Sequence, residues 1–259
     1  QLSGPELEQI VQAVPQAIAN ALQRKTYYFV PLTLGESSEN ESLDGAAGEA
    51  DPDRIMIASE FSSDLSDGAA CHRNATIAGM ECVFISTRLM QDRFALAFEL
   101  YINAGHHFVD VAGVPESFMN LLWSQAESGV RGETSQDAWE HRARAMGHTS
   151  MEQSGDIWNA PPTRMRRNRT QLINQIQRSS QRNAIDEKAR TEYFDAAFAD
   201  AIAIYLLSLT VDFDYTELRE REYPLLAAPA LAERLRHVAQ LFPPNAGQEF
   251  SIHYRRRNG

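Results

Sequence analysis

The sequence predicts an α+β protein in which a small antiparallel or mixed sheet packs on one central helix and a mostly helical half follows. Three observations indicate this class. The first third of the chain contains short aromatic and β-branched segments, which are typical of strands. Residues 88–108 are a long apolar stretch with helical periodicity. The chain after Gly113 has the spacing of amphipathic helices. Such an order of elements indicates an α+β arrangement, with the strands paired antiparallel and packed on the central helix.

The elements of the first half can be placed individually. Residues 5–24 have apolar side chains at helical spacing, and Pro15 is expected to divide that helix. Segment 36–53 is expected to be a mobile acidic loop. Segment 88–108 is expected to be the central helix. The expected strands are residues 27–35, 54–61, 75–79 and 81–87.

The second half is expected to be helical. The expected helices are residues 116–128, 135–146, 168–183, 186–210 and 228–242. We therefore expect a single domain, 1–259, in which residues 1–113 hold the first helix, the strands and the central helix. Residues 114–259 would form a helical subdomain.

The composition limits the classes of partner. The formal net charge is −11, and an acidic surface repels phosphates, so we expect no nucleic-acid partner. The chain contains no run of about 18 uncharged apolar residues, so we expect no membrane span.

Two cysteines, Cys71 and Cys82, lie in the segment CHRNATIAGMEC. Their spacing suits a local loop or hairpin closed by a disulfide and does not suit a zinc knuckle. Glycosylation sequons occur at Asn40, Asn74 and Asn168, and the chain begins with Gln1 rather than Met. Together these features favour a secreted protein. The alternative is a pair of reduced, buried thiols in a cytosolic protein.

Two segments carry a resemblance to a known family. The first is INAGHHFVDVAG at 102–113, and the second is EYFDAAF at 192–198. They resemble the motifs H-E-x-G-H-x-x-x-D-x-x-G and E-F-F-A-E-A-F of zincin-type zinc metallopeptidases of the lethal-factor-like branch. The matching positions are Gly105, His106, Asp110, Gly113, Glu192, Phe194, Ala197 and Phe198. The resemblance implies a zincin-like fold, with His106 and Glu192 at two zinc-ligand positions.

The sequence departs from this motif where the chemistry would be. Ile102 stands in place of the first histidine ligand, and Asn103 stands in place of the glutamate that activates the zinc-bound water. An isoleucine cannot bind a metal, and an amide has no useful basicity. The resemblance therefore implies a catalytically degenerate metallopeptidase-like protein with no catalytic residues and no cofactor.

An unusual metal site is the alternative. His106 and Asp110 are four residues apart, so they share one face if the helix continues to Val111, and with Glu192 they could bind zinc. A third interpretation is that His106 and His107 only satisfy carbonyl groups at a helix end before Gly113. An α+β protein unrelated to zincins is also consistent with the residues.

The residues are consistent with two functions, one of a binding protein and one of an enzyme. The first is a binding or interaction scaffold, which would hold a protein or peptide partner along an edge strand, ECVFIST, as zincins hold their substrates. The second is a metal-dependent hydrolase that uses His106, Asp110 and Glu192. Glu99 is an acid within the otherwise apolar central helix, so it is expected to face a cleft, pair with an arginine such as Arg93, or lie on an exposed edge.

Overall fold

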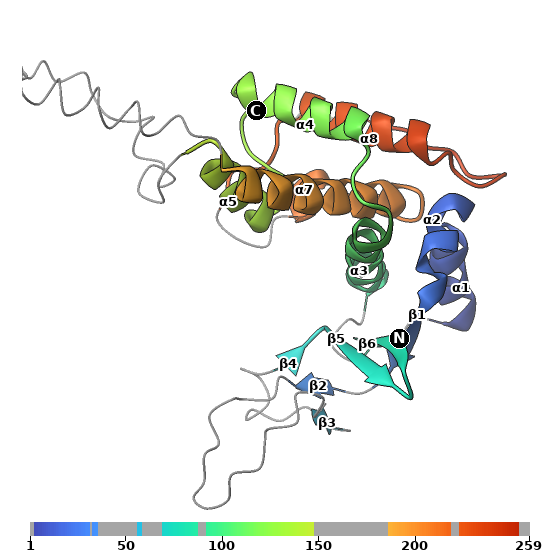
Figure 1. Ribbon diagram of the computed structural model, residues 1–259. Helices are drawn as coiled ribbons and strands as arrows, with labels where there is room; N and C mark the ends of the chain where they lie inside the picture. The colour runs from blue at the N-terminus through green and yellow to red at the C-terminus, as the bar shows by residue number, and fades with distance from the viewer. Residues whose placement is uncertain are drawn as a thin grey trace, which may run out of the picture. The chain divides into compact units, whose positions relative to one another are not determined.

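The computed structural model describes residues 3–31, 33–35, 56–58, 69–87, 92–147, 186–218 and 223–253. These residues confirm the α+β class, with a small three-stranded mixed sheet and a mostly helical remainder (Figure 1). The chain divides into two compact units. Unit 1 consists of Gln1–Ala112, Ile202–Phe213 and Val238–Gly259, and unit 2 consists of Gly113–Ala201 and Asp214–His237. The loop expected at 36–53 and the helix expected at 168–183 lie outside the described residues.

Unit 1 begins with the helices α1 (Gly4–Gln12) and α2 (Gln16–Ala21) and the 3-10 turn η1 (Leu22–Arg24). The Glu6 carboxylate accepts hydrogen bonds from the backbone N–H and the hydroxyl of Ser3, at 2.8 and 2.7 Å, and so caps the start of α1. Pro15 separates α1 from α2, as predicted, because proline cannot donate the hydrogen bond that a continuous helix requires.

The mixed sheet of unit 1 has the strand order β1-β6-β5. The strands are β1 (Lys25–Val30), β5 (His72–Ile77) and β6 (Met80–Ser86). β6 pairs in parallel with β1 and antiparallel with β5, so the segment ECVFIST lies in the centre of the sheet. The prediction that this segment is an edge strand was wrong, because both of its edges already carry a neighbour. The antiparallel strand at the edge is β5.

A second, smaller sheet has the order β3-β2-β4. Its strands are β2 (Thr33–Gly35), β3 (Met56–Ala58) and β4 (Ala69–Ala70). The predicted single strand 27–35 is thus two strands in different sheets. Pro31 lies between them, and a residue without a backbone N–H cannot continue a hydrogen-bonded ladder.

The hairpin expected around the two cysteines is present, but the disulfide across it is not. Ala78 and Gly79 both have positive φ, at 51° and 81°, as a two-residue hairpin turn requires. In the resulting register Cys82 lies opposite Ala75, and the carbonyl of Cys71 accepts a bond from the N–H of Ser86. The two cysteines, both among the described residues, are therefore about 13 Å apart along the sheet, too far to be bonded. The expectation of secretion therefore loses the support of a disulfide and stays a prediction.

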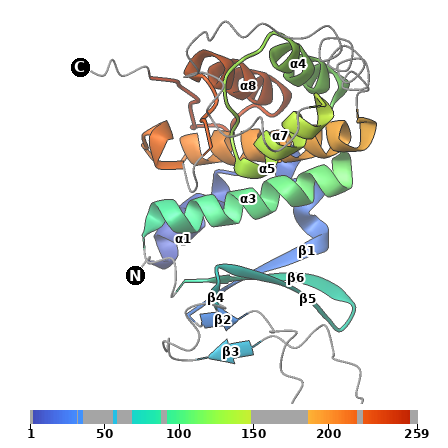
Figure 2. The ribbon, with the colours of Figure 1, turned by 90° about the vertical axis from the view of Figure 1, so that its left-hand side faces the viewer.

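Helix α3 (Arg93–Ala112) lies along one face of the mixed sheet (Figure 2). It continues four residues beyond the predicted end at 108 and stops before Gly113, whose φ is +70°. Its apolar side chains supply much of the core of unit 1, and the Tyr101 hydroxyl donates to the carbonyl of Ile10 in α1 at 2.8 Å.

Polar groups also meet in the interface between α3 and the sheet. His107 is 4% exposed, and its Nδ1 lies 3.4 Å from the hydroxyl of Tyr27 in β1. Burial raises the pKa of Tyr27, so this hydroxyl keeps its proton and can donate it. Burial is also the main reason that the pKa of His107 is lowered, with the charge of Lys25 acting in the same direction. The neutral imidazole of His107 therefore accepts a hydrogen bond from the Tyr27 hydroxyl.

Unit 2 consists mainly of helices. They are α4 (Glu116–Glu127), α5 (Gln136–Ala145), the first part of α7 (Glu187–Ser208), η4 (Tyr215–Leu218) and the first part of α8 (Ala228–Leu241). The predicted helices 116–128, 135–146, 186–210 and 228–242 agree with α4, α5, α7 and α8 to within two residues at each end. Among the helices of the described residues, none combines the length and apolar character needed to cross a bilayer.

A buried ion cluster organises unit 2. Glu133 and Arg234 are both fully buried, and two hydrogen bonds of 2.8 and 3.2 Å join them. Arg142 and the Tyr193 hydroxyl each donate to Oε1 of Glu133 at 2.9 Å, and Arg234 Nε donates to Gln125 at 2.8 Å. Burial alone would lower the pKa of Arg234, but the charge and hydrogen bond of the Glu133 carboxylate act together with Tyr193 and Tyr215 and raise this pKa. Both charges are thus retained in the interior.

A close backbone contact beside this cluster gives a first prediction. Gly132 has a φ of +81°, and a Cβ there would lie 2.0 Å from the carbonyl oxygen of Leu225. Gly129 has a similar φ of +69° but open space around the Cβ position. We expect Gly132→Ala to lower the free energy of unfolding by about 2–4 kcal/mol, since strain and overpacking add, and Gly129→Ala by about 1 kcal/mol. Urea denaturation measures both, and equal losses would contradict the contact.

The burial of His107 gives a second prediction. The folded protein disfavours protonation of His107, whereas the unfolded chain protonates it near the usual pKa of 6.5. The resulting stabilisation is complete above pH 6.5 and is lost as the pH falls below that value. The free energy of unfolding should therefore decrease more between pH 7.5 and 5.5 in the wild type than in His107→Gln. An NMR titration that gives His107 a pKa at or above the usual value would contradict this.

Candidate functional site

The polar face of α3 carries two of the three predicted metal ligands. Glu99, Asn103, His106 and Asp110 follow one another at spacings of four, three and four, so all four lie on one side of the helix. His106 and Asp110 are exposed, and Glu99 and Asn103 are half-buried. Because α3 continues to Ala112, His106 and Asp110 do share a face, as the alternative metal site requires.

Asn103, which stands in place of the motif's catalytic glutamate, makes hydrogen bonds that the sequence does not reveal. The amide nitrogen of Asn103 donates to the backbone carbonyl of Glu99 at 2.8 Å and to Oε1 of the Glu99 carboxylate at 3.1 Å. Asn103 is thus a hydrogen-bond donor within its own helix and has no basic atom to offer. Ile102, at the position of the first ligand, is half-buried.

The Glu99 carboxylate also connects α3 to the edge strand. Its Oε1 is hydrogen-bonded to Nδ1 of His72 in β5. An ionised carboxylate only accepts, so Nδ1 carries the proton. The His72 side chain remains 40% exposed, whereas that of Glu99 is 16% exposed. Glu99 therefore faces β5 and pairs with a histidine rather than with Arg93.

No local pattern in the sequence indicates this pair. His72 and Glu99 are 27 residues apart, and neither belongs to a motif. Only the register of β5 and the position of α3 on the sheet bring them together. Cys71 precedes β5 and continues its pairing with β6 through Ser86, so the side chains of Cys71 and His72 are expected on opposite faces of the sheet.

The edge of β5 itself has a definite hydrogen-bonding pattern. Ser86 N–H donates to the Cys71 carbonyl at 2.9 Å, and every second residue of an antiparallel pair repeats this arrangement. Arg73, Ala75 and Ile77 therefore direct their backbone groups toward β6. The backbone groups of His72, Asn74 and Thr76 point outward, away from β6. Among the described residues, β6 is the one strand that pairs with β5.

The third predicted ligand, Glu192, belongs to unit 2. Its carboxylate lies 3.0 Å from Nδ1 of His141 and 3.6 Å from Nζ of Lys188, with Arg144 at 4.0 Å. These pairs are partly exposed, so each contributes little to stability. They nevertheless surround Glu192 with groups that compete with a metal for its oxygens.

A zinc site requires several ligand side chains that converge on one point. Within either unit, the described residues bring no three His, Cys, Asp or Glu side chains close enough together to hold a metal ion. In unit 1, His106 and Asp110 supply two ligands on the exposed face of α3, and a zinc site needs at least three from the protein.

The chain was compared with known proteins at three levels. No family model matches it, no curated protein matches it, and no solved structure matches it.

Proposed function

We propose that this chain is a peptide-binding scaffold of the metallopeptidase-like type that does not hydrolyse peptide bonds. The partner would be an extended segment of a protein, bound as an additional strand along β5. The sequence predicted binding along ECVFIST, which forms the central strand β6, and the partner is now expected at β5, the edge strand that is antiparallel to β6.

The observation that carries the proposal is the outer edge of β5, which pairs with no other strand of the described residues. The outward backbone groups of His72, Asn74 and Thr76 present three donors and three acceptors in the spacing of a strand. An extended peptide satisfies such groups by forming the next ladder of the sheet. Every residue of β5 is exposed or half-buried, so the strand is accessible to a partner.

Specificity would come from the side chains beside this edge. His72, Asn74 and Thr76 lie on the face of the sheet that α3 covers, since His72 reaches Glu99 on α3. A bound peptide would direct alternate side chains toward the same layer. The exposed His106 and Asp110 on the polar face of α3 are then available to contact them.

The side chains at the motif positions support binding without hydrolysis. Peptide hydrolysis at a zinc site needs three ligands and a base. Asn103 donates hydrogen bonds to Glu99, Ile102 offers no lone pair, and the Glu192 carboxylate is paired with cations. One observation favours the alternative of a metal-dependent hydrolase, namely that His106 and Asp110 are both exposed on one helix face.

The edge of β5 is testable with two substitutions at one position. Peptides that bind the wild type would first be selected from a phage library of random dodecapeptides. Asn74→Pro removes an outward N–H without touching the bonds to β6, and its ring blocks an added strand. We expect it to weaken peptide binding by about tenfold or more, since a lost ladder bond and a steric clash add.

Asn74→Ala is the matched control, because it removes the side chain and keeps the N–H. Its affinity should stay within about threefold of the wild type, as expected for an exposed side chain. Circular dichroism would establish that both variants are folded. Equal binding by Asn74→Pro and the wild type, or a library that yields no binder, would contradict the proposal.

Metal content separates the scaffold from the hydrolase. We expect the purified protein, after dialysis against zinc and then against buffer, to retain much less than one zinc per chain by elemental analysis. His106→Ala should give the same value, since two side chains on one helix face make a weak site. Stoichiometric zinc in the wild type that is lost in His106→Ala would favour the hydrolase instead.

A further inference from the structure

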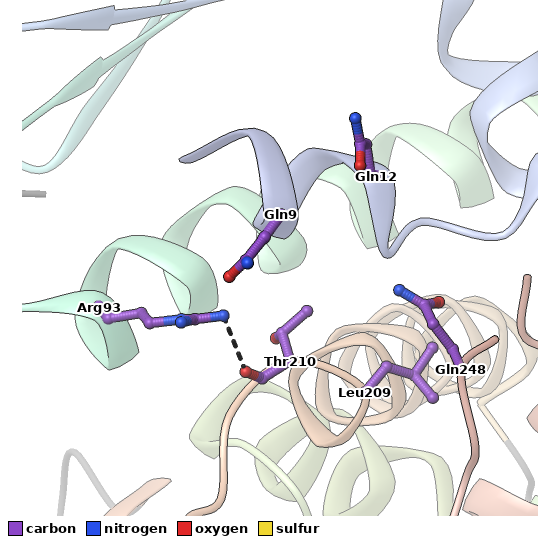
Figure 3. Close-up of a pocket in the computed structure, with 6 residues that line it drawn as sticks. All are labelled: Gln9, Gln12, Arg93, Leu209, Thr210 and Gln248. Atoms are coloured by element: carbon purple, nitrogen blue, oxygen red, sulfur yellow. Dashed lines mark hydrogen bonds between the residues drawn. The ribbon is translucent and has the colours of Figure 1, made fainter. Parts of the chain in front are cut away.

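A small polar cavity in unit 1 lies apart from every residue used in the proposed peptide site. Its volume is about 220 Å³. Six residues line it (Figure 3), contributed by α1, the start of α3, the turn that follows α7 and the C-terminal segment: Gln9, Gln12, Arg93, Leu209, Thr210 and Gln248. Arg93 is the one charged residue among these six, so the cavity has a positive charge on its wall.

Arg93 uses only part of its hydrogen-bonding capacity. Its Nη2 donates to the carbonyl oxygen of Thr210 at 3.2 Å. Its Nε is buried and has no acceptor among the described residues, which also give Arg93 no ion pair. A guanidinium group stays charged at any physiological pH, so this N–H is a permanent donor. A buried donor without an acceptor is unfavourable, and an acceptor that enters the cavity removes that cost.

Glu6, an acid whose charge interacts with that of Arg93, is already engaged elsewhere. The pKa of Glu6 is lowered mainly by the Ser3 N–H and hydroxyl, and to a smaller extent by the charge of Arg93. Its Oε2 accepts both Ser3 hydrogen bonds at the start of α1. Glu6 thus affects the guanidinium group at a distance and leaves its Nε without an acceptor.

Two amides complete the polar wall. Figure 3 shows the Gln9 amide pointing toward the guanidinium group of Arg93. The Oε1 atom of Gln248 is buried and has no donor among the described residues. Gln12 donates to Glu8 at 2.9 Å and serves as wall rather than as ligand.

The segment that carries Gln248 is held in place. The Asn245 amide nitrogen donates to the carbonyls of Gln12 and Val14 at 3.0 and 2.9 Å, and its Oδ1 accepts from the N–H of Gln16. Phe250 packs edge-on against Tyr205, with ring centroids 5.3 Å apart. The cavity is therefore built from anchored elements and is present before any ligand arrives.

We propose that this cavity binds a small oxyanion, with Arg93 as the principal donor and the Gln9 amide as the second. A carboxylate and a phosphate offer the same acceptor atoms to Arg93. Gln248 distinguishes ligands further, because its Oε1 can accept from a hydroxyl group next to the anionic group. With two charge-assisted hydrogen bonds in a partly open cavity, the Kd is expected to be about 1 mM.

The direct test is an NMR titration that follows the Nε–Hε signal of Arg93. Sodium acetate, sodium glycolate and sodium phosphate would be added separately at constant ionic strength, with sodium chloride as the reference. We expect a saturable shift of this signal with at least one oxyanion and none with chloride. Comparison of acetate with phosphate decides which oxyanion the cavity takes, and glycolate should bind more tightly than acetate.

Variants identify the cavity as the place of binding. In the Arg93 variants binding is followed through the side-chain amide signal of Gln248, because the Arg93 signal is lost. Arg93→Gln should reduce affinity by at least about tenfold, as the loss of a charge-assisted donor predicts. Arg93→Lys keeps the charge without the fork and tests the same donor if Arg93→Gln does not fold. Arg73→Gln, which removes an equal charge from β5, should bind as the wild type does. Gln248→Ala should abolish the preference for glycolate over acetate.

Two results would overturn the proposal. One is an Arg93 Nε–Hε signal that does not respond to any of the three oxyanions. The other is binding that persists unchanged in both Arg93 variants or falls equally in Arg73→Gln, since either shows general attraction to positive charge. Neither result bears on peptide binding at β5, so the two proposals fail independently.

Discussion

Helix α3 carries polar side chains on the side that meets the β-sheet, and each must find a partner there, because a buried polar group without a hydrogen bond destabilises the fold. Glu99 pairs with His72 and Asn103, and His107 pairs with Tyr27. These contacts set the position of α3 on the sheet. They also fix the direction in which the face of α3 that carries His106 points. Among the described residues, no strand pairs with the outer edge of β5. The candidate site of unit 1 depends on this packing.

In unit 2, the buried polar groups are charged, and they are satisfied by one another. Glu133 accepts hydrogen bonds from Arg234, Arg142 and the Tyr193 hydroxyl, so both guanidinium groups are held by one carboxylate. Removal of the carboxylate would leave two buried cations near each other, which costs far more than the pair gains. We therefore interpret the cluster as structural, since its members are buried and occupied by one another rather than directed toward a ligand.

The helices could be predicted from the sequence because their signals are local. Pro15 divides the first helix, and the periodicity of α4, α5, α7 and α8 is contained within each segment. Non-local features could not be predicted in this way. Strand β6 is central because it pairs with β1, more than 50 residues earlier in the chain. The expected disulfide is not formed because the turn at Ala78 and Gly79 fixes a register that separates Cys71 from Cys82. The partners of Glu99 and Asn103 likewise depend on how α3 meets β5.

The central claim is that the outer edge of β5 is open in the free protein and closes when a peptide binds. Amide hydrogen exchange measured by NMR tests it directly. The account predicts slow exchange at Arg73, Ala75 and Ile77 and fast exchange at His72, Asn74 and Thr76, with the second group becoming slow when a selected peptide is added. Slow exchange of all six amides in the free protein would show that the edge is already covered and would contradict the account.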